Sequence, residues 1–366
     1  AEGSDLVSYS GVDLDLDWPE RLGAADIRAT LRPAGQEVKV VATIDGFAGF
    51  IAGQIQNLTA EIGAGGGTMS LVGRANTAGD VAGALALNLP KTDGFLTAIG
   101  MSALDLPSKL GASAKMNTDL TMTSDRRLSL RNLAVDLGGN TLKGAADISL
   151  NGVPQINGQL NGGALDLTSA TGEGGSAGGG YSDAVNSGWS KDRIDASGLA
   201  AFNGEIGLKA TSIDLGSFKL GATRALITNE NSRIVFELRE VQAYQGTVSG
   251  QFVMNNRNGL SVGGKIFAQS IAMNPLLADA AGITRFSGAG DAEVSFLASG
   301  NSVQAIMNTM SGKGAIQLGS GTIQGLDLNT LMGNGKGAGG TTVFDSLGAT
   351  FDMKDGNLRN DDLLFV

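Results

Sequence analysis

Apolar and polar positions alternate with a period of two along most of the chain. In residues 234–239, Ile234, Phe236 and Leu238 alternate with polar residues that include Glu237 and Arg239. Successive side chains of a strand point to opposite faces, so this alternation predicts a strand with one buried face and one wet face. Similar runs occur in residues 38–44, 85–89, 206–208, 294–296 and 316–318. Turn sequences such as Asp355-Gly356 separate the runs and predict antiparallel hairpins in a long meander.

Two stretches of the chain carry the same pattern at a fixed spacing of about 106 positions. Upstream of them a two-residue slip pairs Leu133 with Val241 and Gly138 with Gly246. A repeat of this size, built from short strands, predicts one structural module used more than once. The pairs that hold the spacing are Leu128/Ile234, Leu130/Phe236, Leu142/Val248, Gly144/Gly250, Ile148/Met254, Gly158/Gly264, Leu160/Ile266, Leu165/Ile271 and Leu167/Met273.

Helical signals are few and short. Residues 91–100, 274–282, 302–310 and 326–332 predict helices that cap or flank the sheet. Residues 171–180 read TGEGGSAGGG, which is too polar and flexible to pack. We therefore expect a first β-groove segment over 1–168, a Gly/Ser-rich linker or loop over 169–187, and a second segment with short helices over 188–366.

Composition narrows the chemistry. The chain has 57 glycines, which fit tight turns and bends between strands, and neither histidine nor cysteine. Histidine triads, thiol catalysis, disulfides and common zinc sites are therefore excluded. A net charge of −10 argues against nucleic acid and anionic lipid headgroups as partners. No apolar run reaches the roughly 18 residues of a membrane span, so we expect any anchor or signal to lie outside these residues.

The motifs that suggest a cofactor or a reaction fail on their spacing. Asp13, Asp15 and Asp17 would begin a calcium loop, but its sixth and twelfth positions are Trp18 and Ala24. The glycine-rich stretches lack the strand–loop–helix context of phosphate loops. Acidic residues fall mostly at strand exteriors and turns. We expect no cofactor, no metal, no catalytic residue and no enzymatic activity.

The apolar stripe allows two interpretations. It fills an ordinary sandwich or barrel core, or it lines an open groove that receives acyl chains. The low aromatic content of 5% favours the groove, because closed cores between sheets usually draw on aromatic residues. The lining positions chosen by alternation are Val38, Val40, Ile44, Leu85, Leu87, Leu128, Leu130, Leu142, Ile148, Leu150, Ile206, Leu208, Ile234, Phe236, Leu238, Val248, Phe252, Val262, Ile266, Val294, Phe296, Ile316 and Leu318.

An ordered series of short motifs runs through residues 188–366. It comprises WSKDRID at 189–195, GL at 198–199, NGEIGL at 203–208, YQG at 244–246, NPLL at 274–277, FSGAG at 286–290, MSGKG at 310–314 and GTIQGLDL at 321–328. This succession resembles the C-terminal region of AsmA-family proteins of Gram-negative bacteria. The resemblance extends more weakly to PQING at 154–158 and LDL at 165–167.

The resemblance implies an all-β fold with few short helices: a long antiparallel β-meander curled into an elongated apolar-lined groove. It also implies non-enzymatic transfer of phospholipids toward the outer membrane. The expected place is the periplasm, with an inner-membrane anchor that these residues lack, and outer-membrane or envelope proteins as partners. The alternatives are an extracytoplasmic structural or adhesive β-solenoid with a dry closed core, and a glycan-active enzyme with two convergent carboxylates.

Overall fold

The computed structural model describes residues 11–101, 108–169, 188–216, 218–327, 330, 332–333 and 338–366. The chain forms two compact units, unit 1 over residues 1–162 and unit 2 over residues 163–366. Most of the predicted linker, residues 170–187, lies outside the described residues, so the linker stays a prediction.

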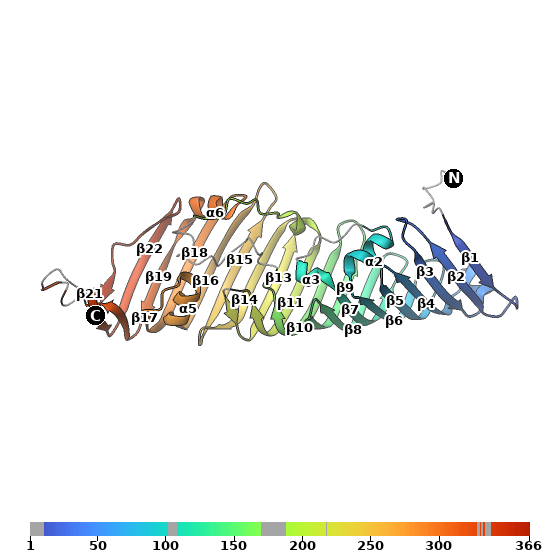
Figure 1. Ribbon diagram of the computed structural model, residues 1–366, viewed down its shortest axis with the longest axis horizontal. Coiled ribbons are helices and arrows are strands. Elements are labelled where there is room, and N and C mark those ends of the chain that lie inside the picture. Colours follow the sequence, from blue (N-terminus) through green and yellow to red (C-terminus); the bar gives the residue numbers. More distant parts are fainter. Residues whose placement is uncertain are drawn as a thin grey trace. The chain divides into compact units, whose positions relative to one another are not determined.

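Unit 1 is an antiparallel meander in which each strand pairs with the next one along the chain (Figure 1). Tight turns make this possible, for example at Gly65-Gly66, where both residues have positive φ. Its strands are β1 (Asp13–Asp17), β2 (Ala25–Leu31), β3 (Val38–Ile44), β4 (Gln56–Ala64), β5 (Gly67–Ala75), β6 (Val81–Leu89), β7 (Ala114–Met122), β8 (Arg127–Leu137), β9 (Asn140–Ser149) and β10 (Gln155–Asp166), which continues into unit 2.

Unit 2 has the same meander with two additions. A three-stranded sheet of β17 (Phe286–Ser287), β20 (Gly321–Leu326) and β21 (Ala338–Phe344) interrupts it, and the last strands pair in short ladders. The remaining strands are β11 (Asn203–Asp214), β12 (Lys219–Leu220), β13 (Thr223–Glu230), β14 (Arg233–Ala243), β15 (Gly246–Asn255), β16 (Ser261–Ala272), β18 (Ala289–Ser299), β19 (Ser311–Leu318), β22 (Leu347–Lys354), β23 (Asn357–Arg359) and β24 (Leu364–Phe365).

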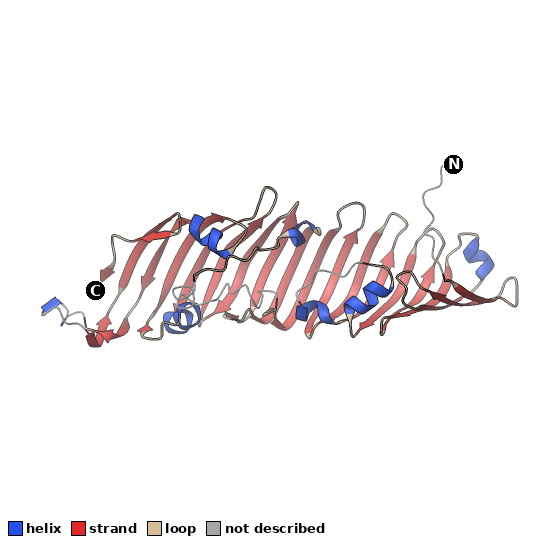
Figure 2. Ribbon diagram, turned by 45° about the horizontal axis from the view of Figure 1, so that its top comes forward, coloured by secondary structure: helices blue, strands red, loops and turns tan. Residues whose placement is uncertain are grey.

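The helices are short and lie in connections between strands (Figure 2). They are α1 (Phe47–Ile51), α2 (Thr92–Ala98), α3 (Ser108–Ala112), α5 (Met273–Ala281), α6 (Val303–Thr309) and the 3₁₀ turn η1 (Ser197–Ala200). Local sequence explains their limits: Pro275 stands in the first turn of α5, and Gly282 ends that helix in the left-handed region. The side chain of Ser302 caps α6 by accepting from the N–H of Ala305.

Each sheet is open, because no ladder among the described residues closes it into a barrel. The predicted all-β meander with few short helices is therefore confirmed. Three predicted helices correspond to α2, α5 and α6, whereas α1 and α3 were not predicted. Of the helix expected at 326–332, residues 328, 329 and 331 lie outside the described residues, so this helix stays a prediction.

The internal repeat appears as equal register in two sets of strands, β8–β9–β10 and β14–β15–β16. Val135 lies opposite Leu142, and Val241, its counterpart at the repeat spacing, lies opposite Val248. Leu160 and Ile266 keep the same relation to Gly144 and Gly250 on the preceding strand. The repeat spacing thus runs through whole hairpins.

The predicted two-residue slip within this repeat is wrong. Both hairpins close with two residues at positive φ, Gly138-Gly139 and Tyr244-Gln245, and these turns keep the repeat spacing. What moves is a β-bulge, which follows Leu130 in β8 and Leu238 in β14. The bulge adds one residue to the strand, so aligning the apolar positions across it produced a false shift.

Candidate functional site

In unit 1 the apolar positions of the strands share one face, here called the inner face. Residues directly opposite in a ladder lie on the same side of the sheet. Val40 lies opposite Ile62, Ile62 opposite Met69, and Met69 opposite Leu87, so four strands build one apolar row. Lys39 and its in-phase neighbours lie on the opposite, outer face.

The predicted lining residues of unit 1 follow this register, with one exception. Leu150 comes after the last residue of β9 and is 42% exposed. The residues that the ladders place together on the inner face are Val38, Val40, Ile44, Leu85, Leu87, Leu128, Leu130, Leu142 and Ile148.

Unit 2 has an inner face of the same kind. Ile206 lies opposite Ile227, Ile227 opposite Phe236, and Phe236 opposite Phe252. The register of these strands is strongly specified, because a slip by one residue would turn their apolar side chains to the outer face. The predicted residues on this face are Ile206, Leu208, Ile234, Phe236, Leu238, Val248, Phe252, Val262, Ile266, Val294, Phe296, Ile316 and Leu318. Their contact with lipid stays a prediction.

Helix α2 covers one rim of the inner face in unit 1. Phe95 of α2 is 3% exposed and packs in a cluster with Val38 and Leu89, at the ends of their strands. Toward the middle of the same strands, Val40 and Leu87 are only half-buried. The face is therefore packed at this rim and accessible farther along the strands.

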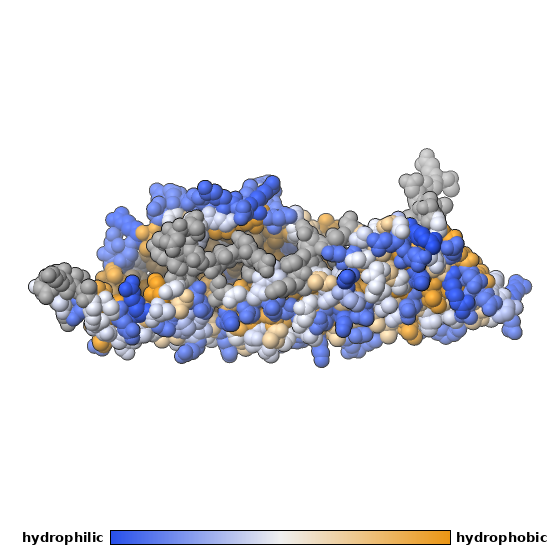
Figure 3. Space-filling model, in the orientation of Figure 1, coloured by the Kyte–Doolittle hydropathy of each residue, from blue (hydrophilic) through white to orange (hydrophobic). Residues whose placement is uncertain are grey.

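Both rims are covered in unit 2. On one, α5 and the small sheet bury Ile271 and Phe344 to 1% and 2% exposure. The Tyr244 hydroxyl donates to Asp279 of α5 at 3.0 Å, and burial together with that carboxylate raises the pKa of Tyr244. On the other rim, α6 and residues 194–196 cover Leu260 and Val262. Figure 3 shows apolar side chains in a hollow beneath the hydrophilic rim that carries α6.

A row of aromatic rings crosses the inner face of unit 2. The ring centroids of Phe236 and Phe252 are 6.1 Å apart, and those of Phe252 and Phe296 are 6.3 Å apart. Gly264 of β16 lies between the last two, directly opposite both. A Cβ at Gly264 would meet the Phe296 ring at 3.2 Å. The Phe296 ring therefore lies close to the space that the missing side chain of Gly264 leaves.

Glycines on the inner face are the part of the site that the sequence interpretation missed. Gly73 and Gly83 lie opposite each other, and a Cβ at Gly73 would meet the Ala82 carbonyl oxygen at 2.2 Å. The repeat positions Gly144 and Gly250 are equally tight against the next strand. Sequence analysis assigned glycine to turns and bends. The missed signal is that these glycines stand in phase with the apolar residues of their strands.

The outer face carries cross-strand ion pairs. Lys265 lies 2.8 Å from Glu293, and Arg131 lies 2.8 Å from Asp147. These side chains are about half exposed, so each pair contributes little to stability and mainly keeps the face wet. Each sheet therefore has one charged face that meets water and one apolar face.

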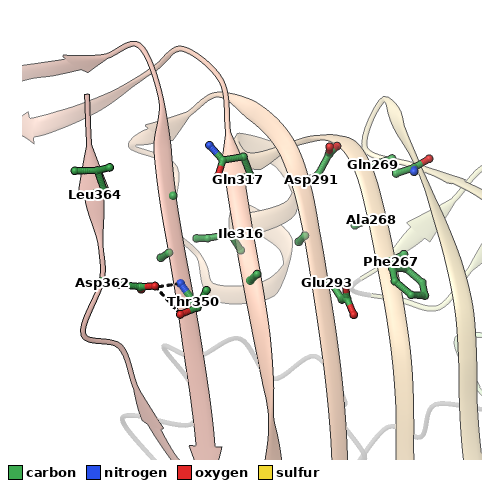
Figure 4. Close-up of a pocket in the computed structure, with 14 residues that line it drawn as sticks. Phe267, Ala268, Gln269, Asp291, Glu293, Ile316, Gln317, Thr350, Asp362 and Leu364 are labelled. Carbon is green, nitrogen blue, oxygen red and sulfur yellow. Dashed lines mark hydrogen bonds between the residues drawn. The ribbon is translucent and has the colours of Figure 1, made fainter.

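A shallow outer-face hollow of about 450 Å³ lies over β16, β18, β19 and β22 (Figure 4). Asp291 and Glu293 point into it from one side, and Asp362 and Leu364 from the other. The Asp362 carboxylate accepts from the Thr350 hydroxyl at 2.6 Å and from the Thr350 N–H at 2.8 Å, which lowers the pKa of Asp362. These bonds hold the last residues of the chain on β22.

Two further observations concern the described residues only. Within them, no group of three or more histidine, cysteine or acidic side chains gathers as a metal site would require. No helix in this part of the chain has the length and apolar character needed to cross a membrane.

The comparisons with known proteins concern most of the chain. The sequence profile of the AsmA family matches residues 102–363. The match begins within unit 1, so it extends well beyond residues 188–366, where the resemblance was strongest. No curated protein and no solved structure matches the chain significantly.

Proposed function

Because the chain belongs to the AsmA family, we propose that it binds phospholipid acyl chains along the inner face of each unit and transfers phospholipid between the inner and outer membranes. It does so without catalysing a reaction. The proposed place is the periplasm, with an anchor outside these residues holding the protein to the inner membrane. Outer-membrane or envelope proteins are the proposed partners.

The observation that carries this proposal is the accessibility of the apolar inner faces. Phe252, Ile266 and Val294 are half-buried in the middle of their strands. At the β1 edge of unit 1, inner-face Leu14 is 66% exposed, and in β23 of unit 2 inner-face Leu358 is 63% exposed. A dry closed core would bury such positions, and soluble proteins rarely leave a long apolar face open without a ligand.

The energetics suit a carrier. Removing apolar surface from water contributes roughly 0.8 kcal/mol for each buried methylene. This contact has no direction, so a chain can move along a row of aliphatic side chains without breaking specific bonds. A polar headgroup would stay in water at the open side of the groove. Affinity and movement then come from the same surface.

Lipid that copurifies with the protein tests the proposal. We expect native mass spectrometry and organic extraction to find phospholipid bound to the purified chain. Replacing Phe236 and Phe252 together with Asp should reduce the bound phospholipid several-fold, because two charges would enter the apolar row.

The matched control for that variant is Leu297→Asp. Leu297 follows Phe296 in β18, points to the outer face and is 65% exposed. This variant should keep its bound lipid. Circular dichroism and thermal melting would check that both variants fold. Unchanged lipid in the folded Phe236/Phe252 variant, or no lipid in the unaltered protein, would contradict the proposal.

A further inference from the structure

Residues 188–202 run along one rim of unit 2 beside α6, and we call them the rim strap (Figure 1). Its first part is tied to the turn that begins α6. The N–H of Gln304 donates to the Ser190 carbonyl at 2.9 Å, and the N–H of Ile194 donates to the Asn301 carbonyl at 2.8 Å. The start of the strap is therefore held to the connection between β18 and β19.

Asparagine amides hold the rest of the strap. The Asn256 amide donates to the Ala196 carbonyl at 3.2 Å, from the end of β15. The Asn229 amide, in β13, donates to the carbonyls of Leu199 at 2.9 Å and Phe202 at 2.8 Å. The strap thus crosses the ends of the strands from β18 back to β13, and side chains rather than a strand ladder make these later attachments.

The underside of the strap is apolar. Ile194 and Ala196 pack against a cluster that contains Leu260, Val262 and Ala298, which are 3%, 9% and 2% exposed. Half-buried residues of the same cluster include Phe252 and Met254 of the inner face and Ile306 and Met310 around α6. Lifting the strap would uncover this part of the apolar wall.

The strap itself is weakly embedded. Every residue from 188 to 200 is exposed or half-buried. Each neutral hydrogen bond contributes little net free energy. Asn229 is almost fully buried, yet its side-chain oxygen has no hydrogen-bond partner in the part of the chain that the structure describes, which makes this attachment less favourable. Segments with few buried contacts open more readily than the strands beneath them.

We propose that the rim strap is a lateral gate of the unit 2 groove. In the observed position it covers the part of the inner face nearest this rim, which is formed by Phe252, Met254 and Val262. When it lifts, an acyl chain reaches that wall from the side instead of sliding in along the strand rows. This inference rests on the proposed lipid binding and adds the route by which lipid loads.

A reversible cross-link tests the gate. Because the chain has no cysteine of its own, only the introduced cysteines can form the disulfide. The variant carries Ser190→Cys with Gln304→Cys, two positions joined by a main-chain hydrogen bond. The measurement is the rate at which a pyrene-labelled phosphatidylcholine passes from phosphatidylcholine vesicles to the protein. Oxidation should slow loading by about tenfold, because closure of a gate controls access. Reduction of the same sample should restore the original rate.

The control pair is Ser295→Cys with Lys313→Cys, which lie directly opposite each other on the outer face. Its oxidation should leave the loading rate unchanged. Mass spectrometry would establish that both disulfides form. Where one does not, a short bis-maleimide would make an irreversible cross-link instead, and the same variant without the reagent would supply the comparison rate. Equal rates for the oxidised and reduced strap variant overturn the gate. No loading by the reduced or unaltered protein overturns the proposed function instead.

A second variant opens the strap from the other direction. Asn256→Ala removes one attachment without touching the inner face. We expect faster amide hydrogen exchange at residues 194–199 and a loading rate severalfold above that of the unaltered protein. Faster exchange with an unchanged loading rate would mean that the strap moves but does not control access, and this outcome also overturns the proposal.

Discussion

Units 1 and 2 each have an apolar inner face of the same kind, but these two faces are covered differently. In unit 1 a cluster around Phe95 of α2 covers one rim, while α1 near the other end of the strands buries none of its residues. In unit 2, α5 with the small sheet covers one rim, and α6 with the rim strap covers the other. The middle of the unit 2 face also carries the row of Phe236, Phe252 and Phe296, whereas the corresponding rows in unit 1 are aliphatic.

This difference separates two properties that a lipid carrier needs. An aliphatic, one-sided face such as that of unit 1 offers little resistance to a sliding chain. A face enclosed from both rims and lined with rings contacts the chain on more sides and holds it longer. If the chain binds lipid as proposed, the comparison predicts that unit 2 controls retention and loading and that unit 1 is the more accessible face.

The largest expected effect comes from truncating the two rim anchors, Phe95→Ala in unit 1 and Phe344→Ala in unit 2. Both rings are almost fully buried. Each change should therefore cost about 3–5 kcal/mol of folding stability. Hydrogen-exchange mass spectrometry should place the loss of protection in the unit that carries the change. Equal loss in both units would mean that they unfold together and would remove the basis for comparing them.

A smaller loss of folding stability is expected when a glycine on the inner face of unit 1 is replaced. Gly73→Ala would bring a Cβ to 2.2 Å from the Ala82 carbonyl oxygen, and this overpacking should cost about 1–3 kcal/mol. Gly63→Ala is the matched control, because Gly63 lies on the outer face of the neighbouring strand with nothing within 4 Å of its Cβ position. Denaturant unfolding should find that control within about 0.5 kcal/mol of the unaltered protein. Equal costs at both positions would contradict the close approach of the strands.

The smallest effect concerns the end of unit 2 and depends on pH. The Thr350 hydroxyl, the Thr350 N–H and the Asn360 amide hold the pKa of Asp362 below its ordinary value of 3.8. A depressed carboxylate pKa stabilises the folded state above the ordinary value, and that stabilisation is lost as pH falls through the folded pKa. As the solution is acidified below that ordinary value, residues 357–366 should therefore loosen from β22.

Asp362→Asn is the control for this pH effect. The Asn side chain cannot ionise. The hydrogen-exchange rate of the Thr350 amide should therefore differ between this variant and the unaltered protein at neutral pH, and the two rates should become equal in acid. In unit 1, Asp147 has a pKa lowered by Ser129 and Arg131, and its local exchange should be unaffected by the change at position 362. A constant difference at all pH values would show that ionisation of Asp362 plays no part.

Alternation predicted the sheet and its faces well, because a strand's side-chain period is local. Val40 and Ile266 could be assigned to the inner face from their immediate neighbours alone. The repeat predicted equal modules but placed a false slip at the bulge, since one extra residue changes phase without changing composition. Leu150 shows a similar limit, because its phase is right but its strand has ended.

Features that depend on distant contacts could not be predicted in this way. The rim strap joins Ser190 to Gln304 and Leu199 to Asn229, and no local pattern marks those partners. Gly264 acquires its role only because Phe296 lies opposite it on another strand. The three-stranded sheet of unit 2 likewise depends on pairing between β17 and β20, which α6 and two strands separate along the chain.

The most direct test of the central claim is photo-crosslinking from single positions on the two faces of one strand. A photoreactive phenylalanine analogue at Phe296 faces the apolar wall, and the same analogue at Leu297 faces outward. After illumination in living cells, mass spectrometry of the purified protein should find phospholipid adducts at position 296 and few or none at position 297. Equal labelling at both positions, or no phospholipid adduct at position 296, would contradict the account.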